Sequence, residues 1–393
     1  MREVVIVGAK RTPIGDLLGS LKDVSAVELG LTAVRAALAQ AGVSPGEVRE
    51  VICGMIYKAG NKGNPARQIQ LSAGMPESGV AFTVDQQCGS GLKAVDLAAQ
   101  SIQLGKADTV VALGTESMSQ APYLLKNARE GYRMGDGALI DSMLHDGLVC
   151  ALVGYHMGLT AENLARQYSI SRQEQDELAL LSHERAVAAM EAGRFQAEIA
   201  PVEIKTRRGV TVVDKDEHPR AGLSLEKLAA LRPAFDKEGT VTAGNASGIN
   251  DGAAALVLME AQLAEKRGLK PLCRYLAGES LGVAPEVMGI GPAYVLPRAL
   301  QSAGLGLGDI GVFEINEAFA AQFLAVNREL GLSMENVNPN GSGIGLGHPV
   351  GCSGARILVS LIYELARRKE RYGAASLCVG GGPAVAAVIE APR

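Results

Sequence analysis

Apolar runs alternate with helix-forming stretches over the first 118 residues. Short, nearly continuous apolar runs at residues 4–9, 51–57, 80–84 and 109–114 predict buried strands. The stretches between them carry helix boundary signals, which are a capping box at 25–28, Gly42, the pair Asn64-Pro65, and Gly74. Strands that are apolar on both faces and separated by helices predict an α/β fold with a parallel sheet covered on both sides.

The same order of elements returns from about residue 272. It comprises a strand from 272, a helix at 294–302, a strand at 312–316, a helix at 317–330, a glycine-rich loop, a helix at 355–366, and strands at 375–379 and 384–389. Overlaying the two halves places the loop of His348 where the first half has the loop of Cys88. Open α/β sheets bind ligands at the carboxyl ends of their strands, so two related halves packed together would let both loops line one crevice.

The middle of the chain has a different character. Residues 119–248 contain glycine-rich loops and a capped helix from Ser171, which indicates an inserted loop domain that contributes to substrate binding. The predicted organisation is an N-terminal half at 1–118 plus 249–271, this insertion at 119–248, and a C-terminal half at 272–393. Basic side chains in the insertion could meet substrate phosphates or form a solvated surface: Lys205, Arg207, Arg208, Arg220, Lys227 and Arg232.

Composition narrows the class of protein. The chain has 393 residues, of which 47% are hydrophobic and 20% charged, so two or three packed units are expected. The net charge of −4 does not favour nucleic acid or an anionic membrane as a partner. An apolar strand starts almost at residue 1, leaving no room for a signal peptide, and we expect a cytoplasmic protein.

The six cysteines contain no C-x-x-C pair: Cys53, Cys88, Cys150, Cys273, Cys352 and Cys378. In a chain of this size that pattern favours reduced thiols over a disulfide framework. His348 and Cys352 lie four residues apart, but no second ligand pair accompanies them, so no metal site is expected.

Cys88 is the leading candidate for a nucleophile. It follows the strand at 80–84 and precedes a helix at 92–104, with Gly89 and Gly91 allowing a tight turn. A sulfur beside the free N–H groups of a helix N-terminus has a lowered pKa, which a thiolate nucleophile needs. The alternative is a buried structural cysteine, which is the commoner kind but needs neither the glycines nor the helix start.

The motifs together resemble the thiolase family, and within it the short-chain acetyl-CoA acetyltransferases. The matching segments run nearly end to end: 88–93 (CGSGLK), 114–123 (GTESMSQAPY), 155–163 (YHMGLTAEN), 239–248 (GTVTAGNASG), 316–320 (NEAFA), 347–351 (GHPVG) and 378–382 (CVGGG). Each motif alone is a modest signal, but together and in this order they are highly specific. The resemblance implies a fold of αβαβα layers, two related halves with mixed sheets, and an inserted loop domain.

The resemblance also implies an activity. That activity is a ping-pong Claisen condensation of two acetyl-CoA molecules to acetoacetyl-CoA and CoA, and the reverse thiolysis, through an S-acetyl-cysteine. Coenzyme A thioesters are then the substrates, no cofactor is needed, and the protein is a homo-oligomer, either a dimer or a tetramer. A broader-chain 3-ketoacyl-CoA thiolase of fatty-acid degradation is the alternative.

The resemblance assigns catalytic roles to a few positions. Cys88 would be acylated, His348 would activate it, and Cys378 would move the proton on the α-carbon of the substrate. Asn316 would orient a water that polarises one thioester oxygen with His348, while the N–H groups of Cys88 and Gly380 hold the other. A second thiol as base and paired N–H donors are what removal of a proton beside a thioester carbonyl requires.

The resemblance places His156 and Met157 at the acyl end, where they would exclude longer chains. Ser247 would contact the pantetheine arm, and the other substrate-binding candidates are Leu148, Arg220, Phe235, Ala243, Ile249, Met288, Ala318 and Phe319. The alternative is that His156 and Met157 only pack a helix start, which is disfavoured because Thr160 is the better helix cap. Asp85, Gln87 and Pro383 depart from the family pattern and leave the acyl-chain length open.

Two rival functions follow from the same sequence. Residues 89–94 match the G-x-G-x-x-A pattern of a dinucleotide-binding turn, and Glu116 follows the next strand as a ribose-binding acid would. That reading leaves Cys88, His348 and Cys378 without a role. A non-catalytic relative would require a missing catalytic residue, and none is missing.

Overall fold

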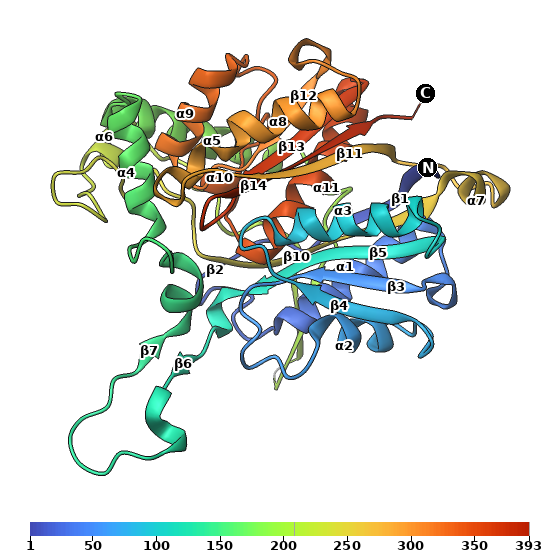
Figure 1. Cartoon of the computed structure of the whole chain (residues 1–393), viewed down its shortest axis with the longest axis horizontal. Coiled ribbons are helices and arrows are strands. Elements are labelled where there is room, and N and C mark those ends of the chain that lie inside the picture. The colour runs from blue at the N-terminus through green and yellow to red at the C-terminus, as the bar shows by residue number, and fades with distance from the viewer. Residues whose placement is uncertain (208, 393) are drawn as a thin grey trace.

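The computed structural model describes residues 1–207 and 209–392. Arg208, one of the basic residues of the expected insertion, lies outside the described residues. The elements form five layers, in which three layers of helices alternate with two layers of strands (Figure 1). This arrangement confirms the predicted αβαβα class.

Helices of both halves form the layers on either side of the strands. One outer layer contains α1 (Ala26–Ala41) and α2 (Pro65–Ser72), and the other contains α8 (Gly291–Ser302) and α9 (Ala320–Leu330). The central layer contains α3 (Ser90–Gln103) and α11 (Val350–Arg368), which contact strands of both halves and each other. The central helices therefore join the two halves into one core, as a buried cluster with side chains from strands of both halves shows.

The strands form one mixed sheet of ten strands. Its order is β12-β13-β14-β11-β1-β10-β5-β3-β4, with β2 paired to β10. The strands are β1 (Val4–Arg11), β2 (Gly15–Asp16), β3 (Glu50–Gly54), β4 (Val80–Val84), β5 (Thr109–Ser117), β10 (Asn250–Glu260), β11 (Cys273–Gly282), β12 (Val312–Ile315), β13 (Tyr372–Cys378) and β14 (Pro383–Glu390). Only β3–β4, β3–β5 and β12–β13 pair in parallel among the described strands, so the sheet is mixed in each half. The parallel sheet predicted from the apolar runs is therefore wrong for β1, which pairs antiparallel with β10 and β11, because burial on both faces produces the same apolar run in either direction.

The two halves share one strand order. Read from the outer edge, the first half runs β4-β3-β5-β10-β1 and the second runs β12-β13-β14-β11. The position that β4 holds beside β3 is taken in the second half by Val337, which forms an isolated parallel bridge with Phe313 of β12. The halves meet at β1 and β11, which pair antiparallel over three residues.

Several predicted boundaries depend on local chemistry and are confirmed. Ser25 forms the predicted capping box at α1, and Gly42 ends that helix with a φ of 63°. Asn64 caps α2 through its side chain, which accepts a hydrogen bond from the N–H of Arg67. By contrast, α11 begins at Val350, five residues earlier than predicted.

Glycines explain how α11 can lie so close to α3. A Cβ on Gly354 would lie 2.3 Å from the backbone nitrogen of Leu92, and one on Gly91 would lie 2.7 Å from that of Ala355. The two helix N-terminal regions therefore touch through backbone atoms. This contact brings the loops that precede both helices, with Cys88 and His348, to the same place.

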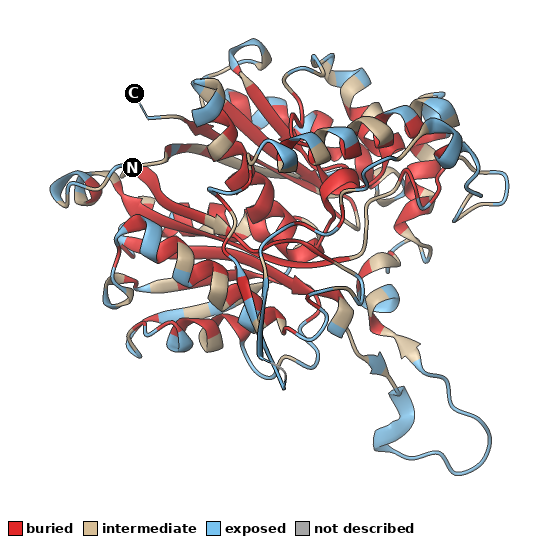
Figure 2. Ribbon diagram, turned by 180° about the vertical axis from the view of Figure 1, so that it is seen from behind, coloured by how far each residue is buried: buried red, intermediate tan, exposed pale blue. Residues whose placement is uncertain are grey.

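The segment between the halves carries helices and two hairpins. Its elements are the β6–β7 pair (Tyr123–Leu124 with Ile140–Asp141), α4 (Met157–Gln167), α5 (Arg172–Glu191), the β8–β9 pair (Val202–Thr206 with Gly209–Val213) and α6 (Leu225–Ala229). The short helices α7 (Ala261–Lys266) and α10 (Gly343–Leu346) complete the set. The β6–β7 arm projects from the body (Figure 1) and is largely exposed (Figure 2).

Candidate active site

Cys88 lies in the tight turn between β4 and α3. Gln87 adopts a φ of 46°, and the hydroxyl of Ser90 accepts from the N–H of Gln86 at 2.9 Å and donates to the carbonyl of Gln87 at 2.6 Å. Gly89 at the helix start has no room for a side chain, since a Cβ there would lie 2.8 Å from Val379. All six cysteines are free, and Cys88 is the one that is not fully buried.

A small cavity holds Cys88 and His348 together. Its volume is about 50 Å³. The residues that line it come from both halves and from the segment between them: Tyr57, Gln87, Cys88, Gly147, Leu148, His156, Met157, Ser247, Met288, Ala318, Phe319, His348, Val350 and Gly380. The predicted meeting of the two loops in one crevice is therefore present.

The prediction that the helix N-terminus lowers the pKa of Cys88 is wrong. Burial raises the pKa of the Cys88 thiol to about 11, although the N–H groups of Gly380 and of Cys88 itself favour the thiolate. The cavity removes the sulfur from water, and this desolvation outweighs the two N–H groups. Cys88 is therefore a neutral thiol before a substrate or a base acts on it.

His348 is a buried neutral imidazole. Its backbone N–H donates to the Asn250 side chain at 2.8 Å, and its ring Nδ1 lies 2.5 Å from the hydroxyl of Ser353. Nε2 lies 3.4 Å from the amide nitrogen of Asn316. Burial, assisted by the positive charge of Arg356, lowers the pKa of His348 to about 3, so the ring can accept a proton only transiently.

Asn316 and Cys378 reach the site from two neighbouring strands. Asn316 follows β12 directly and Cys378 ends β13, and these strands are parallel, so both residues lie at one edge of the sheet. Cys378 is buried, and its pKa is raised above the ordinary range by burial and by the nearby Cys88 sulfur. The sheet therefore places a second thiol beside the first.

Glu116 holds two backbone segments that line the cavity, those of Tyr57 and Val350. Its carboxylate accepts hydrogen bonds from the N–H groups of Ile56 and Gly351 at 3.0 Å and of Tyr57 at 3.1 Å. Burial raises the pKa of Glu116 to about 7 despite these three donors. A fully buried carboxylate bound to backbone is unavailable to a ribose, so the dinucleotide reading of Glu116 is wrong.

The side of the cavity that is predicted to hold the acyl group is formed by the start of α4. The helix begins at Met157, and His156 is its cap through a side-chain bond of 3.0 Å from the N–H of Gly158. The expectation that Thr160 is the cap is wrong, because its hydroxyl bonds instead to the carbonyl of Met157 within the helix. His156 therefore both caps α4 and lines the cavity.

Two aromatic rings fix the wall beside His156. The ring of Phe235 stacks on that of His156 at 4.4 Å between centroids and meets the edge of Phe319 at 6.1 Å. The Met157 methyl lies so close to Gly380 that a Cβ there would be 2.5 Å from it. These contacts leave little freedom for the cavity to widen on the side of His156 and Met157.

The structure brings most of the predicted substrate-binding residues to the cavity. Those that line it are Leu148, His156, Met157, Ser247, Met288, Ala318 and Phe319. Phe235 and Ile249 lie behind the lining, where Phe235 packs on His156 and Ile249 belongs to the cluster that includes Cys88. Arg220 and Ala243 are exposed and do not line it.

Sequence reasoning missed four residues of the lining as site residues. They are Tyr57, Gln87, Gly147 and Val350. A signal existed for Tyr57, because it lies just beyond the carboxyl end of β3, at the edge where β4 leads into the Cys88 turn. Gln87 was visible only as a departure from the family pattern.

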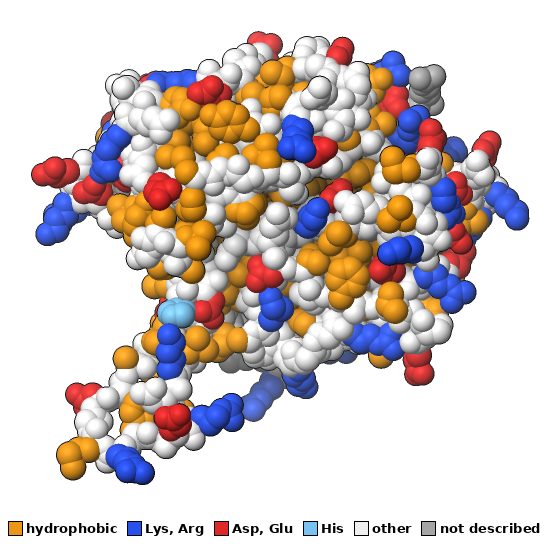
Figure 3. All heavy atoms as spheres, viewed as in Figure 1, with side chains coloured by type: hydrophobic (Ala, Val, Ile, Leu, Met, Phe, Trp, Pro, Cys, Tyr) orange, Lys and Arg blue, Asp and Glu red, His pale blue; other side chains and the backbone are white. Residues whose placement is uncertain are grey.

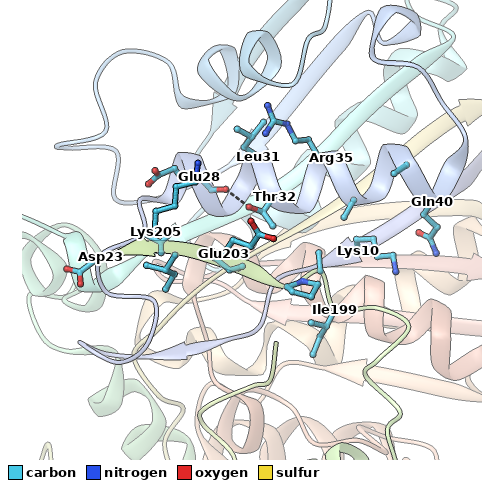
Figure 4. Close-up of a pocket in the computed structure, with 17 residues that line it drawn as sticks. Lys10, Asp23, Glu28, Leu31, Thr32, Arg35, Gln40, Ile199, Glu203 and Lys205 are labelled. Carbon is cyan, nitrogen blue, oxygen red and sulfur yellow. Dashed lines mark hydrogen bonds between the residues drawn. The ribbon is translucent and has the colours of Figure 1, made fainter. Parts of the chain in front are cut away.

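A larger cavity lies elsewhere and has different chemistry. It has a volume of about 1100 Å³ and lies between α1 and β8 (Figure 4). Charges of both signs line it, among them Lys10, Arg35 and Glu28, but no cysteine or histidine does. Within residues 1–207 and 209–392, no cluster of His, Cys, Asp and Glu could hold a metal ion, and no helix is long and apolar enough to cross a membrane.

Comparison with known proteins agrees with this geometry. Residues 4–262 match the thiolase N-terminal domain and residues 269–391 match the thiolase C-terminal domain. The chain is 55% identical to the acetyl-CoA acetyltransferase of Escherichia coli strain K12 over 391 residues, covering 99% of both chains. It is 51% identical to the acetyl-CoA acetyltransferase of Pseudomonas aeruginosa, covering 98% of both.

Solved structures show the same likeness. The acetyl-CoA acetyltransferase of Syntrophomonas wolfei is 50% identical with a TM-score of 0.98, and all of both chains is covered. Human mitochondrial 3-ketoacyl-CoA thiolase is 44% identical with a TM-score of 0.97, covering 100% of this chain and 99% of the other. With two family domains matched in order and relatives similar over their full length, the chain belongs to the thiolase family.

Proposed function

We propose that the protein is an acetyl-CoA acetyltransferase, which condenses two acetyl-CoA molecules to acetoacetyl-CoA and CoA and catalyses the reverse thiolysis. The observation that carries the proposal is the position of Cys88 and His348 in one small cavity, with Cys378 buried close to the Cys88 sulfur. The relatives named acetyl-CoA acetyltransferase support the same activity. The substrates are coenzyme A thioesters, and no cofactor takes part.

In the first half-reaction, the Cys88 thiol gives its proton to His348 and its sulfur attacks the thioester carbonyl. The N–H groups of Cys88 and Gly380 face the sulfur and would bind the oxyanion that forms beside it. Coenzyme A leaves with the proton from His348, and Cys88 carries the acetyl group. One thioester replaces another, so this step is close to reversible.

In the second half-reaction, Cys378 acts as its thiolate, which its raised pKa makes a stronger base, and removes a proton from the methyl carbon of a second acetyl-CoA. The carbanion attacks the acetyl group on Cys88, and the Cys88 sulfur leaves as a thiolate that takes up the proton gained by Cys378. Asn316 and His348 lie 3.4 Å apart and would hold the water that polarises the second thioester oxygen. Ser247 lines the cavity and would contact the pantetheine arm, while Arg220 and Ala243 would meet more distant parts of coenzyme A.

The size of the cavity supports a short acyl chain. On the same measure one water needs about 10–15 Å³, so a cavity of about 50 Å³ has room for only a few small groups. An acetyl group fits this description, whereas each further methylene needs space that His156, Met157 and Phe319 occupy. The alternative of a broader-chain 3-ketoacyl-CoA thiolase requires this wall to move.

The test is a thiolysis series on 3-ketoacyl-CoA esters of increasing chain length with free CoA. We expect kcat/KM to fall steeply beyond four or five carbons, and we expect Cys88→Ser to be inactive on every ester. Equal kcat/KM on a long-chain ester would contradict the short-chain proposal and favour the broader enzyme. Absence of thiolysis on acetoacetyl-CoA would contradict the proposed activity itself.

The proposal includes a homo-oligomer. Strand β4 is an unpaired edge of the sheet that exposes Val80 and Phe82, and such an edge favours pairing with another strand. The β6–β7 arm exposes Tyr123, Tyr132 and Met134, and hydrophobic and basic side chains lie along it (Figure 3). Light scattering should give a dimer or a tetramer, and a monomer at micromolar concentration would contradict this part.

Six free thiols favour a reducing compartment, and we place the enzyme in the cytoplasm.

A further inference from the structure

The turn that leads into His348 is a place where a helix stops. Helix α10 ends at Gly347, whose φ of 98° favours glycine. If the helix continued, the N–H of His348 would donate to the carbonyl of Ile344, four residues earlier. Instead, that N–H donates to Oδ1 of Asn250 at 2.8 Å, and that carbonyl oxygen lies 3.1 Å from Nε2 of His218. Two side chains therefore occupy the two ends of the missing helix bond.

Asp16 joins these two side chains. Its Oδ1 lies 2.5 Å from Nδ1 of His218 and accepts a hydrogen bond from Nδ2 of Asn250 at 3.0 Å. Asn250 and His218 are buried, whereas 40% of the Asp16 side chain is exposed. The three side chains therefore form one bridge of hydrogen bonds, the Asn250–Asp16–His218 bridge, from the N–H of His348 to the carbonyl of Ile344.

The Asn250 amide can be oriented in only one way. Its Oδ1 faces the N–H of His348, and its Nδ2 faces the carbonyl oxygen of Gly15 at 3.1 Å as well as Oδ1 of Asp16. The reversed amide would place an N–H against an N–H and an oxygen against two oxygens. Asp16 therefore accepts from Asn250, and its second contact is with His218.

His218 faces a hydrogen-bond acceptor at each ring nitrogen. The carbonyl oxygen of Ile344 can only accept, and Asp16 is a carboxylate at neutral pH. The hydrogen bond with His218 lowers the pKa of Asp16, and the charge of Arg220 lowers it further against desolvation. A neutral ring would leave one nitrogen lone pair against one of these two oxygens, in a buried place. Both contacts are hydrogen bonds only if each nitrogen carries a proton, which makes the ring an imidazolium.

The charged groups around His218 are compatible with an imidazolium. Asp16 on β2 supplies the opposite charge, and Glu217 and Arg220 belong to the same segment as His218. From α5, the ring of His183 lies 5.8 Å from that of His218 between centroids. Burial lowers the pKa of His183 to about 3, and the charges of His218 and Arg220 lower it further. His183 is therefore neutral, and its Nδ1 accepts from the N–H of Arg220 at 3.3 Å.

The Asn250–Asp16–His218 bridge has little room to shift. A Cβ on Gly248 would lie 2.4 Å from the ring of His218, and one on Gly347 would lie 2.6 Å from Cγ of Asn250. The backbone therefore encloses the bridge at both of its buried members. His218 does not line the cavity of Cys88, so any effect on the reaction is transmitted through the backbone of the turn.

We propose that His218 is a positioning residue, which as an imidazolium paired with Asp16 completes the bridge that holds the turn at 344–348 and keeps His348 in place beside Cys88. The inference rests on the proposed function, in which His348 takes the proton of Cys88. Without the second proton on His218, one end of the bridge opens and the backbone of the turn is free to shift. The ring of His348 would move with it, because the N–H of His348 is the other end of the bridge.

The direct test is nitrogen NMR of the enzyme labelled with 15N-histidine. The chain has five histidines, and the His218 signal is identified by its loss in a His218→Gln variant. The expected wild-type spectrum at neutral pH shows His218 with both ring nitrogens protonated. An unprotonated nitrogen in His218 would overturn the proposal, and so would a wild-type spectrum in which no histidine has both nitrogens protonated.

Asp16→Asn separates the charge of His218 from the shape of the bridge. It keeps an oxygen that can accept from Asn250 but removes the charge opposite His218, so His218 should become neutral at neutral pH. The ratio of the variant's rate of Cys88 acetylation to the wild-type rate should then rise as the pH is lowered and the second proton returns to His218. A ratio that stays constant while the His218 signal changes would overturn the positioning role.

His218→Gln tests the size of the effect, because a glutamine cannot donate to both Asp16 and Ile344 in the geometry of the ring. Acetylation of Cys88 at saturating acetyl-CoA should slow by about 10- to 100-fold, since a displacement of about 1 Å at a reacting group can cost about 100-fold. His183→Gln is the matched control. His183 is a buried neighbour of His218 outside the bridge, and a glutamine oxygen can still accept from the N–H of Arg220.

The outcomes are distinguishable. A wild-type rate in His218→Gln would overturn the positioning role, and so would an equal loss in His183→Gln. If wild-type protein contains the His218 imidazolium but forms no acetyl-enzyme from acetyl-CoA, the proposed function fails, whereas the hydrogen bonds of the bridge stand. If His218→Gln does not fold, the wild-type spectrum and the pH dependence of Asp16→Asn decide the matter.

Discussion

Gly354→Ala tests whether the contact between α3 and α11 positions the active site. The new Cβ would lie 2.3 Å from the backbone nitrogen of Leu92 and 2.8 Å from its Cβ, whereas ordinary contacts begin at 3.4 Å. The backbone of one helix must therefore retreat by about 1 Å, because no flexible side chain can yield instead. Overpacking of this kind costs about 1–3 kcal/mol of the free energy of unfolding.

The same displacement should slow the reaction, because Cys88 precedes one helix and His348 precedes the other. A shift of about 1 Å between reacting groups can lower a rate by about 100-fold. We would measure the free energy of unfolding by urea denaturation and kcat for thiolysis of acetoacetyl-CoA. Gly308→Ala is the control, since a Cβ there meets nothing within 4 Å and should leave both quantities nearly unchanged. If Gly354→Ala keeps wild-type stability and rate, the two helices do not hold the site by this contact.

Three further predictions concern the cavity itself. Cys378→Ala should still form the acetyl-enzyme on Cys88, but its rate of condensation should fall by at least about 100-fold, as for removal of a general base. Loss of acetylation as well would show that the two thiols act as one unit. The rate of Cys88 alkylation by iodoacetamide should rise about tenfold per pH unit up to pH 10, because the pKa of the thiol is raised to about 11 and only the thiolate reacts. A plateau of this rate below pH 8 would show that burial does not raise the pKa of Cys88. Met157→Ala should raise kcat/KM for longer 3-ketoacyl-CoA esters relative to acetoacetyl-CoA by about fourfold per added methylene, because burying each CH₂ group contributes ~0.8 kcal/mol. An unchanged ratio would show that Met157 does not limit the length of the acyl chain.

The features predictable from sequence are those determined by neighbouring residues. The capping box at Ser25, the left-handed Gly42 and the Asn64 cap each depend on three or four consecutive positions, and all three are present. The direction of β10 and β14 could not be predicted, because a continuous apolar run looks the same in parallel and antiparallel strands. The repeated order of elements nevertheless located the meeting of the Cys88 and His348 loops.

The parts of the site that sequence reasoning missed depend on contacts between distant segments. Glu116 accepts hydrogen bonds from backbone N–H groups 60 and 235 residues away, so no local pattern could show that it holds segments of the cavity lining in place. The pKa of Cys88 was predicted with the wrong sign because a helix start is visible in the sequence, whereas the burial that outweighs it is produced by both halves. The same limit applies to Ser353, whose contact with His348 depends on the fold of the turn between them.

Covalent acetylation is the most direct test of the central claim that Cys88 is the nucleophile of this cavity. The purified protein would be incubated with acetyl-CoA, quenched in acid and mapped by peptide mass spectrometry, with Cys88→Ser as the control. We expect an acetyl group, a mass increase of about 42 Da from replacing S–H by a thioester, on the peptide containing Cys88 and on no peptide of the control. Acetylation of Cys378 in its place, or an unmodified Cys88 in protein that still catalyses thiolysis, would contradict it.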